Sequence, residues 1–308
     1  MQPQALRPGA TAVLTSWNRK DVVRANLLSL RAQTVPFQDI IIVDNHSTDG
    51  TVEMLASEFP EATAIVMPHS NYGACETFNI GFACARTEFT AILDDDVELP
   101  PDWLAMLIAK FKTEPATTAM LSTKVVEPGM PDSLINSEAV NRERFMATFR
   151  GCGTLAKTDI LAKAGYYDER FFIYGNERDL ASRILGLGYR VKQYPAVVTY
   201  HKNPWGQRKG KRSIYFHTRN FWMYAIKHVP LGDLLTFPFK FLKQQMSKPK
   251  GGFADATGTI GALENINKTP WGWWIVIRAT LAAFTIHLPY CLKRRSPVRA
   301  PDFELPVK

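Results

Sequence analysis

The sequence predicts an α/β fold in which a mainly parallel β-sheet is flanked by helices. Through the first hundred residues, short β-rich runs alternate with helical stretches, and this alternation is typical of βαβ units. The 308 residues are 46% hydrophobic, which suffices for a sizeable core in one large domain or two modest ones. Disordered, collagen-like and disulfide-rich classes of protein are therefore excluded.

The predicted elements of the first hundred residues follow in regular order. Residues 11–16 (TAVLTS) and 39–45 (DIIIVDN) are apolar runs rich in β-branched residues, which predicts two strands. The further predictions are strands at residues 62–67 and 89–93 and helices at residues 21–33, 50–59 and 73–85. Ligands of such sheets bind outside the carboxyl ends of the strands. We therefore expect the site at the loops SWNR, DNHSTDG and DDDVE.

Beyond residue 100 the pattern loosens. The sequence predicts a helix at residues 101–112, leaves 113–150 unassigned, and then predicts a helix near 177–187 and a strand near 197–201. Shorter elements are expected at residues 151–155 and 160–165. After residue 202 the composition becomes basic and aromatic, with helices expected at 213–227 and 231–246, a glycine-rich linker at 248–253 and an apolar stretch at 271–292.

Charge is distributed unevenly along the chain. Residues 200–308 carry 18 Lys and Arg against 5 Asp and Glu, whereas residues 1–199 carry 19 against 24. This asymmetry favours chemistry in the first part and an anionic partner for the second. The four cysteines form no CxxC pair, and the first residues do not resemble a secretory signal. We therefore expect a cytoplasmic protein with reduced thiols.

Three adjacent carboxylates, Asp94, Asp95 and Asp96, directly follow the apolar run FTAIL. Like charges this close destabilise the fold unless a cation is present. Carboxylates at a strand end suit Mg²⁺ or Mn²⁺, both of which leave coordination positions open for phosphate oxygens. A solvated acidic turn is the alternative, but the strand just before the carboxylates favours a metal site.

Five segments in sequence resemble motifs of the family 2 glycosyltransferases, in particular the bacterial rhamnosyltransferase-like members. TSWNR resembles the family's T-x-x-N-R, IIVDNHSTDGT its V-D-N-x-S-x-D-G-T, and NYGACETFNIGFACA its N-x-G-x-x-x-x-x-N-x-G-x-x-x-A. LDDDVELPPDWL resembles the D-x-D motif with its following helix, and the segment ending in NERDLASR resembles the acceptor-side block with E-D-x-D-L-x-x-R. Each match is modest alone, but together they span roughly residues 11–201 in the family's order.

The resemblance implies a GT-A-like fold and an inverting, metal-dependent sugar transfer without a protein nucleophile. Residues 1–201 would form the catalytic domain, with a donor half to about residue 100 and an acceptor half from about 101. Residues 202–308 would form a helical C-terminal region. The donor would be a UDP or dTDP sugar and the acceptor a saccharide or a lipid-linked molecule, in the synthesis of cell-surface polysaccharide or glycolipid.

The resemblance also assigns residues to the donor site. Asp44 would accept the imide N–H of uracil or thymine, although a turn-capping role is the alternative. Glycine would allow close approach of the backbone to the nucleoside. The implied nucleotide-sugar-binding residues are Thr15, Asn18, Arg19, Asp44, Asn71, Gly73, Asp94 and Asp95.

A metal and a base complete the implied site. Asp96 would ligate the metal, and His201 at the end of VVTYH would complete the ligand set, with imidazole better suited to Mn²⁺ than to Mg²⁺. Where relatives usually carry Glu-Asp, this chain has Asn176-Glu177, so Glu177 would be the catalytic base.

Three further residues take expected roles on the acceptor side. Asp179 would support the helix or the acceptor, Trp103 would form an apolar platform for the acceptor sugar, and Asn176 would contact the acceptor. For Asp179 and Glu177, simple helix capping is the alternative. An Arg219-Asn220 pair also matches the family, without an evident role.

The C-terminal region predicts contact with a membrane surface. Residues 271–292 are almost long enough to span a bilayer, but Arg278, His287 and Pro289 disfavour a span. Three tryptophans at one end and basic residues at the other suit a helix in the headgroup layer, peripheral on the cytosolic face of the cell membrane. Two ordinary packed helices are the alternative.

Other functions have less support. A nucleotidyltransferase would need a glycine-rich loop after the first strand, which TSWNRKD does not supply, and a dinucleotide oxidoreductase would need GxGxxG there. No nucleic-acid-binding motif accompanies the basic tail, so we expect no nucleic-acid partner. A catalytically weak nucleotide-sugar-binding module of the same fold stays open because of Asn176-Glu177.

Overall fold

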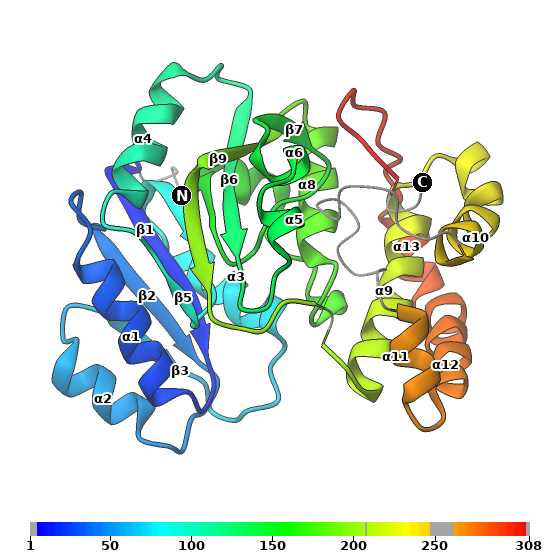
Figure 1. The fold of residues 1–308 in the computed structure, drawn as a ribbon, viewed down its shortest axis with the longest axis horizontal. Helices are drawn as coiled ribbons and strands as arrows, with labels where there is room; N and C mark the ends of the chain where they lie inside the picture. Colours follow the sequence, from blue (N-terminus) through cyan, green and yellow to red (C-terminus); the bar gives the residue numbers. More distant parts are fainter. Residues whose placement is uncertain (1–4, 207, 247–261, 306–308) are drawn as a thin grey trace.

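A computed structural model describes residues 5–206, 208–246 and 262–305, and within them the chain forms one nine-stranded sheet with helices on both faces (Figure 1). The sheet has the order β3-β2-β1-β4-β8-β6-β9-β5, with β7 also paired to β9. The predicted α/β class is confirmed, and the C-terminal helices gather beside the sheet at one end of the molecule.

The first four strands form the parallel part of the sheet. Strands β2 and β4 both pair in parallel with β1, and β3 pairs in parallel with β2. All four carboxyl ends therefore meet at one edge, as the alternating pattern predicts. The elements are β1 (Arg7–Ser16), α1 (Lys20–Arg31), β2 (Asp39–Asp44), α2 (Thr51–Glu58), β3 (Thr63–Val66), α3 (Ala74–Cys84) and β4 (Thr87–Ile92).

The second part of the sheet is mixed, which differs from the mainly parallel sheet expected. Strand β8 runs antiparallel to both β4 and β6, β9 runs parallel to β6, and β5 and β7 run antiparallel to β9. This part holds β5 (Val97–Glu98), α4 (Trp103–Thr113), β6 (Thr118–Val126), α5 (Asp132–Ile135), α6 (Glu138–Asn141), β7 (Arg144–Met146), β8 (Thr154–Lys157), α7 (Thr158–Ala164), the 3₁₀ turn η1 (Glu169–Phe171), α8 (Asn176–Gly186) and β9 (Arg190–His201). The reversed β8 brings the turn before it to the edge where β4 ends, because Thr154 pairs with Ile92.

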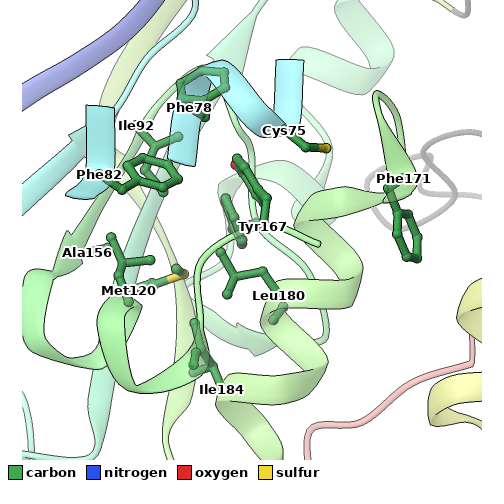
Figure 2. Close-up of a cluster of buried hydrophobic side chains, with 14 of the residues drawn as sticks. Cys75, Phe78, Phe82, Ile92, Met120, Ala156, Tyr167, Phe171, Leu180 and Ile184 are labelled. Carbon is green, nitrogen blue, oxygen red and sulfur yellow. The ribbon is translucent and has the colours of Figure 1, made fainter. Parts of the chain in front are cut away.

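The core lies on both faces of the sheet. On one face, Phe78 and Phe82 of α3 pack against Tyr167, with ring centroids 5.8 and 5.4 Å apart, and Leu180 of α8 lies beneath (Figure 2). The other face is covered by α1, α2 and α4. Full burial of such side chains stabilises the fold by roughly 1.5–3 kcal/mol each. Cys75, Cys152 and Cys291 are buried free thiols and Cys84 is an exposed one, as expected for reduced cysteines.

The C-terminal helices are α9 (Lys211–His228), α10 (Leu231–Met246), α11 (Ala262–Lys268), α12 (Gly272–Thr285) and α13 (Leu288–Lys293). Residues of α9 and α13, such as Met223 and Cys291, belong to the same apolar cluster as Phe78 and Leu180. The helices therefore pack on the sheet region through a shared core. The glycine-rich linker predicted at 248–253 lies outside the described residues.

The last apolar stretch forms two helices instead of the single one expected. Pro289 lies in the first turn of α13 and has no N–H to donate to the carbonyl of Thr285, where α12 ends. Helix α12 packs against α9, where Trp222 contacts Phe284 with ring centroids 5.4 Å apart. Among the described helices, none combines the length and the hydropathy needed to cross a bilayer.

Candidate active site

Strand pairing brings the acidic turn after β4 to the end of β9. The chain turns from Asp94–Asp96 directly into β5, where Val97 pairs with His201. The backbone N–H of Lys202 also donates to the carbonyl of Asp96, at 2.8 Å. His201 is thus placed beside the carboxylates although about a hundred residues separate them in sequence.

Asp94, Asp96 and His201 form a cluster with the chemistry of a metal site. His201 Nε2 lies 3.0 Å from Asp96 Oδ1 and 3.6 Å from Asp94 Oδ2. One ligand atom from each residue falls within a 4.8 Å group. Among the described residues none donates a well-aligned hydrogen bond to the buried Asp96 Oδ1. Two carboxylates and an imidazole converging on one point therefore fit a divalent cation.

A second layer of side chains orients these ligands. Glu127 Oε1 lies 2.7 Å from His201 Nδ1, so it can hold the proton on Nδ1 and leave Nε2 free to ligate. Asp96 Oδ2 accepts hydrogen bonds from Arg19 Nη1, at 2.7 Å, and from Asn203. Sequence reasoning missed Glu127 and Asn203. The signals for them were an acidic residue just after the apolar run of β6 and an amide two residues beyond His201.

The electrostatics of the cluster favour bound cations. Burial raises the pKa of Asp94 to about 6 and that of Asp95 to about 7. Burial alone would lower the pKa of His201, but hydrogen bonds to Asp96 and Glu127 and the charge of Asp94 raise it to about 10. His201 therefore carries a proton when no other cation balances these carboxylates, and a divalent cation would replace that proton.

Arg19 pairs with the acidic turn. Its Nη1 lies 2.7 Å from both Asp95 Oδ1 and Asp96 Oδ2, so the guanidinium joins two of the three adjacent carboxylates. Burial would raise the pKa of Asp96, but His201 and Arg19 hold it below its usual range. The partners of Arg19 in this structure are thus the carboxylates of the acidic turn, and its role in donor binding stays a prediction.

Glu177, the predicted base, lies in the first turn of α8. The helix begins at Asn176, after Gly175 in the left-handed conformation (φ 75°). A Cβ on Gly151 would lie 2.8 Å from Glu177 Oε1, so that glycine leaves room for the carboxylate. Burial raises the pKa of Glu177, while its own backbone N–H, Asn176 and Arg150 oppose the rise. Glu177 is close enough to Asp94 that its charge contributes to the raised pKa of Asp94.

The structure places Asp179, expected to support the helix or the acceptor, in the interior. Its side chain is fully buried and lies 2.8 Å from His228 Nε2, with an ion pair to Lys227 and another to Arg183. Lys227 also lies 2.7 Å from Asp168. These cations hold the pKa of Asp179 well below its ordinary value, although burial alone would raise it. Asp179 thus joins α8 to α9, and its side chain is not exposed.

Three other residues with predicted contacts have interior partners. Trp103 is 0% exposed and its Nε1 donates to Thr199 Oγ1 at 2.9 Å, so it is a core residue and offers no platform. Asn176 is buried and hydrogen-bonds with Tyr167 and Glu177, so its amide has interior partners. A Cβ on Gly73 would lie 2.6 Å from Phe172, so this glycine allows a close approach of Phe172.

The remaining predicted donor residues lie at the carboxyl edge of β1–β3. Thr15 is near the end of β1 and Asp44 ends β2, where both its oxygens accept hydrogen bonds from Ser47. Asn18 Oδ1 accepts from the backbone of Thr48 at 2.7 Å. Asn71 is exposed in the loop before α3. The structure thus gives turn-stabilising bonds to Asn18 and Asp44 and brings these loops beside one another.

Comparison with known sequences finds a family model that matches part of the chain. Residues 11–159 match the model of the family described as Glycosyl transferase family 2. The chain is 22% identical to the probable glycosyltransferase YdaM of Bacillus subtilis, over 78% of this chain and 60% of that protein. It is 27% identical to the succinoglycan biosynthesis protein ExoO of Rhizobium meliloti, over 41% and 37%. The matches thus span 60% or less of these relatives' own lengths.

Solved structures share the fold. The structure of residues 1–349 of S. aureus TarS aligns with a TM-score of 0.58 at 13% identity, covering 92% of this chain and 83% of that one. The mannosyltransferase PcManGT from Pyrobaculum calidifontis, in complex with GDP-Man and Mn²⁺, aligns with a TM-score of 0.55 at 18% identity, covering 94% and 84%. The sheet and its flanking helices therefore have a GT-A-like arrangement.

Proposed function

We propose that this chain, whose residues 11–159 match the model of glycosyl transferase family 2, is a metal-dependent inverting glycosyltransferase. The observation that carries the proposal is the convergence of Asp94, Asp96 and His201 at the carboxyl edge of the sheet, with Glu177 nearby. The donor is a nucleoside-diphosphate sugar, and the acceptor is a saccharide or a lipid-linked molecule in cell-surface polysaccharide or glycolipid synthesis. Because the motifs resemble those of rhamnosyltransferases, we propose that the transferred sugar is a hexose or a deoxyhexose.

The acidic cluster would hold the donor's diphosphate. Asp94, Asp96 and His201 would bind Mn²⁺ or Mg²⁺, and that ion supplies positive charge to the diphosphate as it leaves. Arg19 and Asn203 fix Asp96 through its Oδ2, which leaves Oδ1 directed at His201 and the cation position. The imidazole ligand favours Mn²⁺ over Mg²⁺.

Glu177 would act as the base. The acceptor hydroxyl transfers its proton to the Glu177 carboxylate while its oxygen bonds to the sugar's anomeric carbon. At the same time the bond from that carbon to the diphosphate oxygen breaks, and the electron pair leaves with the nucleoside diphosphate. The raised pKa of Glu177 makes its carboxylate a stronger base than a solvent-exposed one. One displacement inverts the anomeric configuration and needs no protein nucleophile.

The nucleobase of the donor would lie over the carboxyl ends of β1–β3. Asp44, Thr15 and Asn71 lie at this edge, and Asp44 retains lone pairs that can accept the imide N–H of uracil or thymine. We therefore propose a UDP or dTDP donor. S. aureus TarS has been solved with UDP-GlcNAc and PcManGT with GDP-Man, so structures with this fold are known with a uracil nucleotide and with a guanine nucleotide.

The proposed contact with the cytosolic face of a membrane rests on the outward face of α12. Its small residues Gly272, Ala279, Ala282 and Ala283 are buried. Its large apolar side chains point the other way: Trp273, Trp274, Ile277 and Leu281 are 49–59% exposed. With 18 basic and 5 acidic residues in 200–308, such a face suits an anionic lipid surface. A lipid-linked acceptor would be reached there.

Vesicle flotation tests the membrane contact. The wild type should float with phosphatidylglycerol vesicles at low salt and less with phosphatidylcholine vesicles, and a double variant Ile277→Glu, Leu281→Glu should lose flotation. Leu28→Glu, on the exposed side of α1, is the matched control and should float like the wild type. Equal flotation of all three proteins, or none with either lipid, would refute the contact. A shift of the wild type to a dimer that the double variant abolishes would instead assign this face to a second copy.

Nucleoside diphosphate release tests the reaction. The purified chain, given UDP-, dTDP- and GDP-sugars with Mn²⁺ and candidate acceptors, should release one nucleoside diphosphate and form a glycoside of inverted configuration. Asp96→Ala should abolish release and Glu98→Ala, exposed two residues further on, should not. Retention of configuration, or turnover that survives Asp96→Ala, would contradict the mechanism.

A further inference from the structure

The 170–175 loop, which leads into α8 and to Glu177, has an unusual backbone. Phe172 and Tyr174 adopt positive φ angles of 66° and 68°, and Gly175 follows at 75°. Non-glycine residues in such conformations cost about 1–3 kcal/mol each and persist only where the surroundings hold them. The carbonyl of Phe171 accepts the backbone N–H of Ile173, and that of Phe172 accepts the N–H of Cys75, while the other donors to this loop come from side chains.

Two adjacent side chains of α9 supply those donors. Asn220 Nδ2 lies 2.9 Å from the carbonyl oxygen of Phe171, 2.7 Å from that of Ile173 and 2.8 Å from that of Tyr174. Arg219 Nη2 donates to the carbonyls of Arg170 and Phe171, at 2.7 and 2.9 Å.

The two side chains also fix each other. Arg219 Nε donates to Asn220 Oδ1 at 2.9 Å, which sets the orientation of the amide so that its NH₂ faces the carbonyls. Both residues are more than nine-tenths buried. Loss of the Asn220 donors would remove the side-chain partner of the Ile173 and Tyr174 carbonyls, and an interior carbonyl left without a partner costs about 1–3 kcal/mol.

Aromatic stacking adds to the same contact. Phe172 stacks on Phe216, with ring centroids 5.0 Å apart, and Tyr174 stacks on His217 at 4.3 Å. Phe172 also fills the space over Gly73, and its carbonyl accepts the N–H of Cys75 at 3.1 Å. The loop thus joins the start of α3 on the donor side to the start of α8 on the acceptor side.

We propose that Arg219 and Asn220 are positioning residues, which set the place of Glu177 by fixing the backbone of the loop that leads to it. The inference rests on the proposed function, in which Glu177 takes the acceptor's proton. A displacement of about 1 Å in such a group costs on the order of 10²-fold in rate. The pair touches neither the metal site nor the donor edge, so its effect falls on the transfer step.

Asn220→Asp tests the proposal because it keeps the size and Oδ1 of the side chain but removes the NH₂ donors. At saturating donor, kcat should fall by about 10²-fold, while the KM for the donor and the affinity for Mn²⁺ with UDP stay within twofold of wild type. Amide hydrogen exchange should accelerate in residues 170–178 and stay unchanged in β2. Asn220→Gln, which keeps the NH₂, should restore part of kcat.

Trp222→Phe is the matched control on α9. It removes the hydrogen bond from Trp222 Nε1 to Thr280 on another face of the helix. It should lower stability with little change in kcat. If Asn220→Asp leaves kcat unchanged, or lowers it no more than Trp222→Phe, the positioning role is refuted. If the wild type transfers no sugar, the proposed function fails, and exchange then decides the inference alone: unaltered exchange at 170–178 in Asn220→Asp overturns it.

Discussion

The two oxygens of Asp96 have different surroundings. Oδ2 accepts from Arg19 and Asn203, whereas Oδ1 faces His201 Nε2 at 3.0 Å. His201 is held in turn by Glu127 on its other nitrogen. A carboxylate and an imidazole that are each fixed from behind present their remaining atoms to a common point, which is the arrangement that a metal site needs.

Glu127 gives a prediction at the residue scale. Glu127→Gln should weaken Mn²⁺ binding by about 10–100-fold, because the amide no longer orients His201 or strengthens it as a ligand. Titration of Mn²⁺ in the presence of UDP, followed by electron paramagnetic resonance, measures the affinity. Glu98→Gln is the control, since Glu98 is exposed and pairs with Lys202. Equal Mn²⁺ affinity in Glu127→Gln and wild type would contradict the role of Glu127.

Glu177 gives a second prediction at this scale. Glu177→Gln should lower kcat by about 10²-fold or more, because no base remains for the acceptor proton. The same variant should raise Tm at neutral pH, since burial raises the pKa of Glu177 and the ionised carboxylate therefore destabilises the fold. That gain in Tm should vanish as pH falls below about 4, where the carboxyl is protonated in both states. A variant that keeps full kcat, or unfolds at lower temperature at pH 7, would refute this.

The sequence indicated the candidate metal ligands more accurately than it indicated which residues are buried in the core. Asp94 and Asp96 follow a strand and His201 ends one, so strand order alone places them at one edge. Trp103 and Asp179 lie in helices, where sequence does not indicate which neighbour a side chain meets. Asp179 is enclosed by residues of α9 that lie about fifty positions away, and no local pattern encodes that contact.

At the scale of elements, a buried ion cluster joins α8 to α9. Asp179 lies with Lys227, His228 and Arg183, and Lys227 also pairs with Asp168 just before η1. The loop held by Arg219 and Asn220 lies between these two helices. The ion cluster thus connects the acceptor-side helix to the first helix beyond the proposed domain boundary at residue 201.

Asp179→Asn tests the cluster. It should destabilise the fold by about 3–5 kcal/mol at pH 7, because the buried Lys227 loses one of its two carboxylates. Because the pKa of Asp179 is depressed, the difference in free energy of unfolding between the wild type and Asp179→Asn should be largest above about pH 4. It should become smaller as the pH falls toward that pKa. Urea unfolding measures both. Asp159→Asn, which removes an exposed pair with Lys163 in α7, should cost less than about 1 kcal/mol, and equal costs would contradict the account.

The predicted elements were most accurate where local pattern and fold agree. The parallel strands and helices up to β4 lie within a few residues of their predicted bounds. The stretch 113–150 could not be assigned, because its strands and short helices are set by pairing with β9, whose residues come later in the chain. The same long-range pairing makes the second half of the sheet mixed, which no alternation of strand and helix indicates.

At the scale of the whole molecule, the carboxyl edge of the sheet and the C-terminal helices form one connected body. The core that contains Tyr167 and Leu180 also contains Met223 and Cys291 of the C-terminal helices. The acceptor-side residue Glu177 is therefore supported from both parts of the chain. Helix α12 lies beside α9 at the same end of the molecule (Figure 1), and its large apolar side chains are exposed. A membrane-bound acceptor would approach from that end.

Thermal unfolding with donors and metals tests directly whether Asp94, Asp96 and His201 bind a metal together with a nucleotide sugar. Wild type, Asp96→Ala and Glu98→Ala would be heated with UDP-, dTDP- and GDP-sugars, each with Mn²⁺, Mg²⁺ or EDTA. With metal, one nucleotide sugar at about 100 times its Kd should stabilise both the wild type and Glu98→Ala by roughly 2.7 kcal/mol. With EDTA, it should stabilise neither protein. Asp96→Ala should show no shift. If no donor stabilises the wild type with any metal, or if Asp96→Ala responds like the wild type, the account of this site is contradicted.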